Sequence, residues 1–316
     1  MGIKVFVDGQ EGTTGLQIHE LLARRGDVEV LRIAPDLRKD TTERARLLNA
    51  ADVAFLCLPD AAAREAVALV QNPDTCVIDA SSAHRVDPAW VFGLPELMPE
   101  QRKRLRRAKR ISNPGCHATG FILLLRPLVD AGLIEPSTPL TAGSISGYSG
   151  GGRRLIEQYI VEPQPAKLAS PRPYGLSLAH KHVPEMMVQS ALTARPIFTP
   201  VVANFYKGLV VSVPLHLDAY RDPIEPQRLH AALTARYANE RFVHVMPLSD
   251  PTTLDDGYFD VQACNNTNRC ELFVFARGGQ AVLLARLDNL GKGAAGAAIQ
   301  SMNVHLGLDE GLGLAA

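Results

Sequence analysis

The sequence lacks long apolar runs and an excess of charge of either sign. Among its 316 residues, Lys plus Arg and Asp plus Glu both number 33, so the formal net charge is zero. Such a balance gives no support to binding of nucleic acid or an anionic membrane through the whole surface. No apolar stretch approaches the ~20 residues of a membrane span, and the opening MGIKVFVDG lacks a signal-peptide pattern. We therefore expect a cytoplasmic protein with no membrane and no nucleic-acid partner.

Cysteine is also scarce. The chain has five cysteines, an odd number, and a reducing compartment is expected, so a disulfide framework is not predicted. Cys57 and Cys76 lie in apolar strand-like runs, which is typical of buried small hydrophobic residues. Cys264 and Cys270 match no usual zinc spacing and have no second pair beside them, so we expect no metal.

One segment departs from the neutral balance. Residues 100–110, EQRKRLRRAKR, are strongly basic. No aromatic residues interleave with these cations, so the pattern favours a solvated helix face over a phosphate or nucleic-acid site.

The chain is longer than one compact core usually is, which predicts two domains. Before Cys116, short apolar runs alternate with helical patterns. This alternation predicts a parallel sheet with helical crossovers, an α/β Rossmann-like doubly wound domain. After Cys116, strand-like runs lie among Pro- and Gly-rich loops, which indicates an α+β domain with a mostly antiparallel sheet. The helical spacing of TGLQIHELLARRG places Leu16, Ile18, Leu21 and Leu22 on one side of the first helix.

Three glycines separate the first predicted strand from the first helix. Gly9, Gly12 and Gly15 lie in DGQEGTTG, with Thr13 and Thr14 between the last two. Glycines let a backbone approach a pyrophosphate, and a helix N-terminus offers free N–H groups and a positive dipole end. The spacing G-x-x-G-x-x-G differs from the usual G-x-G-x-x-G. Its place at the first strand-to-helix turn nevertheless favours a dinucleotide site over an ordinary glycine-rich turn.

The end of the second strand indicates which dinucleotide is bound. NAD sites usually carry an acidic residue there for the ribose 2′-hydroxyl. This strand ends LRIA, with Arg32 in place of an acid, and Arg38 and Lys39 follow. Cations suit the 2′-phosphate, so we predict a preference for NADP(H).

A cysteine stands where a loop becomes a helix. Cys116 follows Asn-Pro-Gly and precedes the helical pattern HATGFILLLRPLV. A helix N-terminus stabilises a thiolate and lowers a cysteine pKa from ~8.5 into roughly the 3.5–7.5 range. This position favours a nucleophile over a buried structural thiol.

A compact segment supplies acid–base partners for such a nucleophile. YGLSLAHKHVPEM contains Tyr174, His180, His182 and Glu185. Two histidines at i and i+2 point the same way on an extended strand, and Glu185 could orient an imidazole. A metal site would need a third ligand, and none stands out in the segment.

With these residues in hand, the sequence resembles the N-acetyl-gamma-glutamyl-phosphate reductases of arginine biosynthesis, in the shorter of their two forms. The resemblance runs over nearly the whole chain. In place of the aromatic residue that usually follows the cysteine in the longer form, this chain has His117, and after FTP it reads VV rather than a histidine. The motifs that carry the resemblance are GQEGTTGLQIHELL, DASSAHRV, GLPEL, SNPGCHATG, GYSGGGRRL, HKHVPEM and DNLGKGAAGAAIQSMN.

The resemblance implies a reaction and a place for each residue in it. The Cys116 thiolate would attack the acyl phosphate, phosphate would leave, and NADPH would reduce the resulting thioester to the semialdehyde. His180 would be the acid–base, with His182 as the alternative and Tyr174 and Glu185 in support. The cofactor side would include Ser81, Asn289, Lys292 and Gly293, and the substrate side Asn113, Arg85, Ser149, Gly150 and Arg153.

The resemblance also implies the domain limits and the assembly. We expect the NADP-binding domain over residues 1–117, completed by a C-terminal helix over 292–316. The catalytic and oligomerisation domain would span 118–291, and a homodimer or homotetramer is expected.

Three alternatives stay open from the sequence. Aspartate-semialdehyde dehydrogenase shares the cysteine chemistry but not the motifs NPGC and HKHVPE. N-acetyl-aminoadipyl-phosphate reductase differs by one methylene in its substrate, typically worth only ~1–3 kcal/mol of discrimination. A non-catalytic NADP-binding regulator could share the fold, but it has no need for Cys116 opposite a histidine pair.

Overall fold

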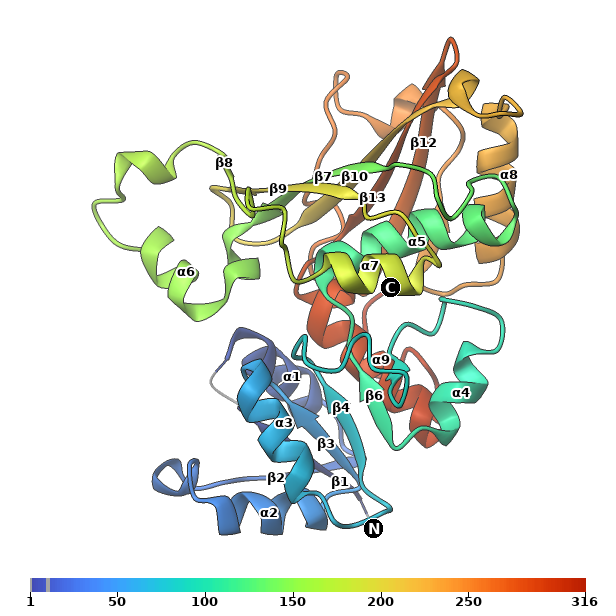
Figure 1. Cartoon of the computed structure of the whole chain (residues 1–316). Coiled ribbons are helices and arrows are strands. Elements are labelled where there is room, and N and C mark those ends of the chain that lie inside the picture. The colour runs from blue at the N-terminus through green and yellow to red at the C-terminus, as the bar shows by residue number, and fades with distance from the viewer. Residues whose placement is uncertain (1, 10–11) are drawn as a thin grey trace. The chain divides into compact units, whose positions relative to one another are not determined.

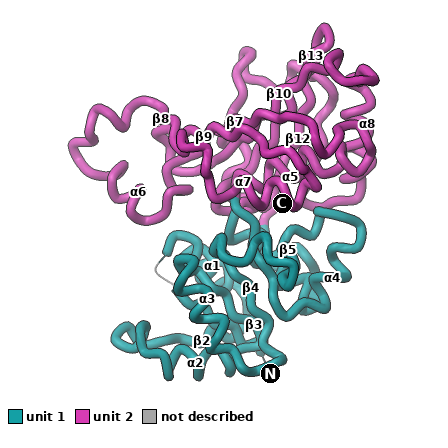
Figure 2. The backbone as a smooth tube through the Cα atoms, in the orientation of Figure 1, with its two compact units in different colours: residues 1–115, 294–314 teal, residues 116–293, 315–316 magenta. Residues whose placement is uncertain are grey.

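The computed structural model describes residues 2–9 and 12–316. The chain forms two compact units: unit 1 holds residues 1–115 and 294–314, and unit 2 holds residues 116–293 and 315–316 (Figure 2). The domain limits expected from the sequence, after 117 and before 292, lie two residues away from these. The last two residues belong to unit 2 because the backbone carbonyl of Ala315 accepts a hydrogen bond from the Asn268 N–H, 2.7 Å away.

A parallel six-stranded sheet forms the centre of unit 1. Its order is β2-β1-β3-β4-β6-β5, and all five neighbouring pairs are parallel. The central strands β3 and β4 are buried along their whole length and β1 over its last four residues, so these strands are mostly continuous apolar runs rather than alternating ones. Their bounds are β1 Ile3–Asp8, β2 Val28–Leu31, β3 Val53–Leu56, β4 Cys76–Asp79, β5 Val91–Phe92 and β6 Arg110–Ser112.

Helices cover both faces of this sheet. One face buries Val5 and Val7 with helices α1, α4 and α9, and the other buries Phe6 with α2 and α3. Helix α9, red in Figure 1, comes from the end of the chain and packs on α1 and α4. It ends at Gly307, whose φ of 72° is a left-handed conformation that favours glycine. The helices are α1 Thr13–Ala23, α2 Thr41–Ala50, α3 Asp60–Leu69, α4 Gln101–Arg107 and α9 Gly296–Leu306.

The two amphipathic patterns noted in the sequence have different outcomes. The expected apolar side of α1 is wrong at one position: Leu16 is 53% exposed, and the buried residues are Gly15, Ile18 and Leu22. Their spacing of three and four defines the face toward the sheet, and Leu16 lies beside it. The basic helix α4 buries Gln101 and Leu105 and exposes most of its cations, as predicted.

The chain reverses direction across the sheet between β1 and β3. After β1 it crosses to β2 on one side and then returns to β3 on the other. The loops that follow β1 and β3 touch, because a Cβ added to Gly9 would lie 2.3 Å from the Cys57 backbone oxygen. Ligands of open α/β sheets bind at the carboxyl ends of strands at such a switch point.

Unit 2 is built on a seven-stranded mixed sheet of order β11-β12-β13-β10-β7-β9-β8. Four of the six neighbouring pairs are antiparallel, while β11–β12 and β7–β9 are parallel. The strands are β7 Thr141–Gly147, β8 Arg172–Pro173, β9 Ile197–Ala203, β10 Leu209–His216, β11 Val243–Val245, β12 Cys270–Arg277 and β13 Gln280–Leu287.

Helices of unit 2 pack on one face of this sheet. Helix α5 lies against β10 and β13, and α8 against β11 and β12 (Figure 1). The contact of α5 is close because Gly120 faces the sheet: a Cβ there would lie 3.0 Å from Val211 and 3.2 Å from Ala285. The segment that connects β7 to β8 along the chain contains α6 and projects away from the sheet (Figure 1). The helices are α5 Cys116–Asp130, α6 Gly152–Tyr159, α7 Val183–Gln189 and α8 Pro226–Tyr237.

No helix among the described residues combines the length and the apolar character that a membrane span requires.

Candidate active site

Helix α5 begins at Cys116, as the sequence predicts. Its first turn carries no acidic residue, so no negative side chain in that turn opposes a thiolate at the positive end of the helix dipole. Gly293 allows the chain to pass close to this cysteine. A Cβ on Gly293 would lie 2.7 Å from the Cys116 Cβ, closer than two carbons can approach.

Three other thiols, those of Cys57, Cys76 and Cys264, are held in the protonated form. Burial, followed by the charges of Asp79 and Asp8, raises the pKa of Cys57 to about 12. Burial raises the pKa of Cys76 to about 12 and that of Cys264 to about 11. Because the thiolate is the nucleophile, these three cysteines are unreactive at neutral pH.

His117, the residue after the cysteine, is buried and fixed by two hydrogen bonds. The Ser144 hydroxyl donates to the Val210 carbonyl at 2.8 Å, so it accepts the proton of His117 Nδ1, also at 2.8 Å. His117 Nε2 is then the acceptor for the Tyr174 hydroxyl, 3.0 Å away. Burial, and then the charge of His180, lowers the pKa of His117 to about 3. His117 is therefore neutral, and neither ring nitrogen is suited to take a proton.

Tyr174 lies beside the cysteine as well as beside His117. Burial raises the pKa of its hydroxyl, and the negative charge of Cys116 raises it further. The phenol therefore stays protonated and acts as a hydrogen-bond donor. The sequence pointed to Tyr174 as a supporting residue, and the structure brings it to the cysteine cluster.

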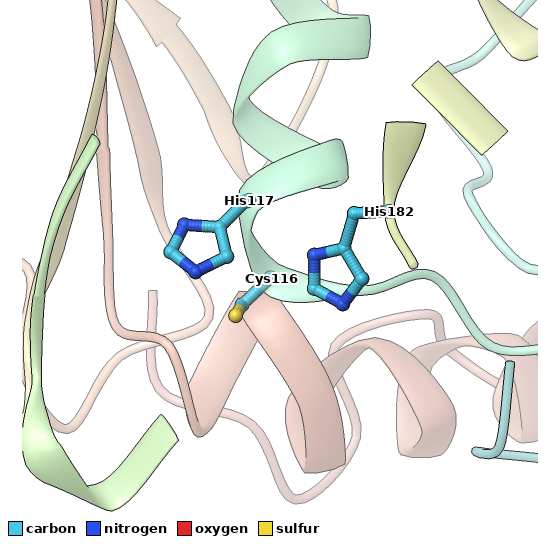
Figure 3. Close-up of side chains that lie close together, drawn as sticks. All are labelled: Cys116, His117 and His182. Atoms are coloured by element: carbon cyan, nitrogen blue, oxygen red, sulfur yellow. The ribbon is translucent and has the colours of Figure 1, made fainter. Parts of the chain in front are cut away.

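Cys116, His117 and His182 form one cluster. Each offers one atom, the cysteine sulfur or a ring nitrogen, and these atoms all lie within 4.8 Å of one another. Figure 3 shows the sulfur below and between the two imidazole rings. His182 is 6% exposed, caps α7, and has Nε2 4.0 Å from Glu185 Oε1. The buried Glu185 carboxylate faces the Nε2 side of this ring and can balance a positive charge on it.

His180 lies next to this cluster. Its ring centroid is 4.8 Å from that of His182 and 5.6 Å from that of His117. The His182 backbone N–H donates to His180 Nδ1 at 3.2 Å. A neutral His180 therefore carries its proton on Nε2, which makes that nitrogen a proton donor.

Sequence reasoning missed the part that His117 and Ser144 play. The signal for His117 was its place beside the cysteine, where a departure from the longer family form was noted. Ser144 had no local signal, because its partner lies 27 residues earlier on α5 and only the packing of that helix on the sheet brings the two together.

The other expected residues of unit 2 fall into a second network. Asn289 donates to the Ser149 hydroxyl at 2.9 Å and accepts from the Gly208 N–H at 2.8 Å, so it joins three loops. A Cβ on Gly150 would lie 3.2 Å from Ser146 Oγ and 3.6 Å from Asn289. Arg153 is exposed and paired with Glu157 along α6.

Lys292 is fully buried, and its Nζ lies 5.9 Å from the centre of the Phe242 ring. At this distance a cation and the face of an aromatic ring attract each other. A role of Lys292 on the cofactor side stays a prediction.

The glycine loop of unit 1 leaves space that no side chain of the described residues fills. Gly12 caps α1 with no side-chain hydrogen bond, and the first turn has no acidic residue. Its φ is −71°, and an added Cβ would meet only the backbone oxygens of Gly9 and Cys57, at 3.5 and 3.7 Å. The structure therefore gives no internal reason for a glycine at position 12, and the N–H groups of Thr13 and Thr14 lie at an uncapped helix end. These features fit a dinucleotide pyrophosphate.

Charges around this loop also fit an anion. Asp8 at the end of β1 is buried and paired with Arg44 at 2.8 Å, so its charge is balanced. Arg32 is exposed after β2. Burial, and then the Arg32 charge, lowers the pKa of His19 on α1, which places the guanidinium near that helix.

Ser81, Arg85 and Asn113 are held inside unit 1. Ser81 donates to Asp79 at 2.7 Å, and the same carboxylate oxygen is 2.6 Å from His84 Nδ1. Arg85 is buried and donates to the backbone oxygens of Asn113 and Ala80. The Asn113 amide nitrogen donates to the Ala294 carbonyl, while its side-chain oxygen is buried without a hydrogen bond in the described structure.

Close relatives identify the family. A protein of Nostoc sp. (strain PCC 7120) named N-acetyl-gamma-glutamyl-phosphate reductase 2 is 48% identical, and the match covers 98% of this chain and 99% of the relative. N-acetyl-gamma-glutamyl-phosphate reductase of Burkholderia cenocepacia is also 48% identical, over 96% and 97% of the two chains. The chain belongs to the N-acetyl-gamma-glutamyl-phosphate reductase family.

The two halves match a wider family. Residues 4–105 match the family described as semialdehyde dehydrogenase, NAD binding domain, and residues 116–289 match the family described as semialdehyde dehydrogenase, dimerisation domain. A nicotinamide cofactor is thus common to the group.

Solved structures show the same fold at low identity. Aspartate semialdehyde dehydrogenase II from Vibrio cholerae gives a TM-score of 0.72 at 17% identity over 97% and 99% of the two chains. The Candida albicans aspartate semialdehyde dehydrogenase solved with NADP gives a TM-score of 0.63 at 15% identity, and the match covers 96% of this chain and 98% of that one. The α/β fold expected from the sequence is confirmed.

Proposed function

We propose that this chain reduces N-acetyl-L-glutamyl 5-phosphate to N-acetyl-L-glutamate 5-semialdehyde with NADPH, releasing phosphate. The observation that carries the proposal is the place of Cys116 at the first residue of α5, with nitrogens of His117 and His182 near its sulfur. The two family members described above bear the name of this activity and are matched over nearly their whole length.

Cys116 is the proposed nucleophile. Its thiolate adds to the acyl carbon, the carbon–oxygen bond to phosphate breaks, and a thioester remains on the enzyme. His182 is suited to take the thiol proton, since its ring lies at the sulfur and Glu185 balances the charge that forms. His117, held neutral by burial, instead lines the site and holds Tyr174 as a donor.

His180 is the proposed acid–base for the carbonyl oxygen. When bound, the reduced nicotinamide supplies the hydride for the thioester carbon. The oxygen of the resulting tetrahedral carbon gains negative charge, and the Nε2–H of His180 can donate to it. The carbon–sulfur bond then breaks, the semialdehyde leaves, and Cys116 is again a thiolate. His182 remains the alternative for this step, and comparing His180→Gln with His182→Gln separates the two roles.

We propose NADP(H) as the preferred cofactor of unit 1. The support is the uncapped start of α1 for the pyrophosphate and the Arg32 cation, in place of an acid, for the 2′-phosphate. Gly9, Gly12 and the first turn of α1 would bind the pyrophosphate, and Ser81 would support the neighbouring loop. Gly293 and Asn289 would position chain segments in unit 2. Arg85, Asn113, Ser149 and Gly150 would shape the substrate side, and Arg153 would contribute positive charge at the surface.

A homodimer or homotetramer is proposed through the open face of the unit 2 sheet. The strand face opposite α5 exposes Ile145, Ile197 and Val282 by 41, 52 and 39%. Their registers place Ile145 on the same face as Val201, and Val282 opposite Pro214. An apolar sheet face of this kind is typical of a subunit contact, so Ile197→Lys should lower the mass measured by light scattering.

A reverse-direction assay tests the proposed activity. Wild type, Cys116→Ser and the control Cys76→Ala receive N-acetyl-L-glutamate semialdehyde, phosphate and NADP⁺, and NADPH formation is followed. Wild type and control should form NADPH only when phosphate is present. The rate of NADPH formation should fall at least about a thousandfold in Cys116→Ser. Turnover only with the one-carbon-longer semialdehyde would move the enzyme to the aminoadipate reaction. An aspartate semialdehyde preference would favour aspartate-semialdehyde dehydrogenase, and cofactor binding without turnover would favour a regulator.

A further inference from the structure

The cysteine–histidine cluster has the composition of a metal site. Cys116, His117 and His182 offer one sulfur and two imidazole nitrogens, all within 4.8 Å of one another. Thiolate and imidazole are the donors that Zn²⁺ prefers, and a site with three protein ligands keeps a fourth position open. No local pattern predicts the third ligand, because His117 precedes His182 by 65 positions (182 − 117) and only the fold brings them together.

Both histidines have a polar neighbour on their other nitrogen: a hydrogen-bonding partner for His117 and a carboxylate at ion-pair distance for His182. His117 donates through Nδ1 to Ser144, which itself donates to the Val210 carbonyl. His182 has Nε2 4.0 Å from the buried Glu185 carboxylate. Metal-binding histidines usually have such partners, which fix the ring and raise its basicity. An ion would bind the nitrogens that are turned toward the cysteine in Figure 3.

Little rearrangement would close the cluster around an ion. With Zn–S near 2.3 Å and Zn–N near 2.0–2.1 Å, tetrahedral ligand atoms lie about 3.5 Å apart, so the cluster must contract by roughly 1 Å. Cys116 and His117 are consecutive residues of α5, and His182 caps α7, so the ligands stand on helices that pack together. The Tyr174 hydroxyl would have to leave His117 Nε2, and its side chain is 36% exposed, so it has room to move.

We propose that Cys116, His117 and His182 bind one Zn²⁺ ion, or a similar borderline-soft divalent cation, in competition with substrate. Binding replaces the thiol proton, which passes to solvent, and forms a zinc–thiolate bond while the fourth position holds water. The bound sulfur no longer attacks a carbonyl carbon. Metal binding is independent of the proposed reductase activity, whereas its consequence, reversible inhibition, rests on that activity.

Cobalt titration of the full chain tests the site without relying on catalysis. Co²⁺ in a tetrahedral site with a thiolate ligand gives strong visible bands and a sulfur-to-cobalt charge-transfer band, and Zn²⁺ should abolish both at one equivalent. The variants are Cys116→Ser, His117→Gln and His182→Gln, with the exposed His216→Gln as the matched control. A competing chromophoric chelator gives the zinc affinity of each.

We expect one zinc ion per chain in the wild type and in His216→Gln. Cys116→Ser should lose the charge-transfer band, and each histidine variant should weaken zinc binding by at least about tenfold. Ser144→Ala, which keeps all three ligands, should weaken binding by about tenfold or more and serves as a second variant if a ligand substitution impairs folding. Weak octahedral cobalt spectra, or zinc binding that none of the variants changes, would overturn the site.

Activity measured on the same samples separates the two proposals. Metal binding in a chain without reductase turnover would leave the zinc site standing and remove the proposed function. Reductase turnover that micromolar Zn²⁺ does not inhibit, in a chain that binds no cobalt, would leave the proposed function standing and remove the zinc site. Inhibition that a chelator reverses, together with loss of the cobalt bands in Cys116→Ser, supports both.

Discussion

Two strand-to-helix junctions of this chain share one feature, a helix N-terminus with free backbone N–H groups, but they serve different functions. The turn after β1 leads into α1 through Gly9 and Gly12, and the turn after β6 leads into α5 at Cys116. Neither helix has an acidic residue in its first turn. At α1 the glycines leave the free N–H groups open, whereas at α5 side chains crowd the helix start.

The difference shows that the neighbouring side chains determine whether an uncapped helix N-terminus binds an anion or supports a reactive thiolate. Without side chains, the N–H groups and the dipole can bind an anion, which suits a cofactor pyrophosphate. With a cysteine at the first position and imidazoles beside it, the same field favours a thiolate, and in the proposed reaction His180 and His182 move protons. Substitutions at the α1 junction should therefore change cofactor affinity, and those at the α5 junction should change kcat.

After loss of the Cys116 thiol itself, Gly293→Ala should give the largest effect at the α5 junction. The new methyl group would lie 2.7 Å from the Cys116 Cβ, so the cysteine or the Gly293 segment must move. A displacement near 1 Å from the reacting atom costs on the order of a hundredfold. We expect kcat to fall by about that factor, with the KM for NADPH unchanged.

Gly26→Ala is the matched control, since nothing lies within 4 Å of its added Cβ. Full activity in Gly293→Ala, with cooperative unfolding like that of the wild type, would show that the cysteine position does not depend on this contact.

A pair of glycine variants tests the α1 junction. Gly12→Ala adds a methyl group into the open loop, where it meets no atom closer than 3.5 Å. We expect near wild-type stability and a KM for NADP(H) raised about tenfold, equivalent to ~1.4 kcal/mol of lost binding. Gly9→Ala instead meets the Cys57 carbonyl at 2.3 Å with φ of +87°, so it should lower the free energy of unfolding by about 1–3 kcal/mol.

Urea unfolding and initial rates at varied cofactor concentration give the two quantities for each variant. An unchanged KM in Gly12→Ala would mean that the open space at the start of α1 does not hold the cofactor.

His117 should make the stability of the protein depend on pH. Its pKa is about 3 in the folded state, lowered by burial, against 6.5 for the free side chain. Between these values the unfolded chain binds a proton that the folded chain does not, so stability falls as the pH falls from 6.5 toward 3. The slope from this group is at most about 1.4 kcal/mol per pH unit. Urea unfolding between pH 7.5 and pH 5 should therefore show a shallower loss in His117→Gln than in wild type.

His216→Gln, an exposed histidine on β10, is the control and should keep the wild-type slope. Parallel pH profiles for wild type and His117→Gln would contradict the neutral, buried state of His117.

The local features of both junctions were predictable, and the contacts between distant segments were not. The Asn-Pro-Gly turn and the apolar run fix the start of α5 at Cys116, because turn residues and helical spacing act over a few positions. The bond between His117 and Ser144 depends on how α5 packs on the sheet, and the bond from Ser144 to Val210 depends on the register of β7 with β10; no local pattern encodes either. The parallel pairing of β7 with β9 is of the same kind, since residues 148–196 separate the two strands.

The lack of long-range information in local patterns also explains two differences from expectation. They are the apolar side of α1 and the extended strand expected for His180 and His182. Helical spacing shows that Leu16 and Ile18 are apolar, but the sheet decides which of them is buried. Sequence reasoning also placed His180 and His182 on an extended strand, yet His182 caps α7 and turns its ring toward Cys116. The residues were found from their chemistry, and their division of roles needed the fold.

Arg32→Ala should give the smallest effect, at the edge of the α1 junction. Arg32 is exposed, so its attraction to a 2′-phosphate is screened by solvent and salt. We expect the ratio of kcat/KM for NADPH to that for NADH to fall by about fivefold to tenfold, with kcat unchanged, because one charge-assisted contact at a wet site contributes about 1 kcal/mol. Arg106→Ala, which removes an exposed cation on α4, is the control for a general loss of positive charge. An unchanged ratio in Arg32→Ala would assign the cofactor preference to other cations of the loop after β2, and raising the salt concentration should shrink the difference between wild type and Arg32→Ala if the contact is electrostatic.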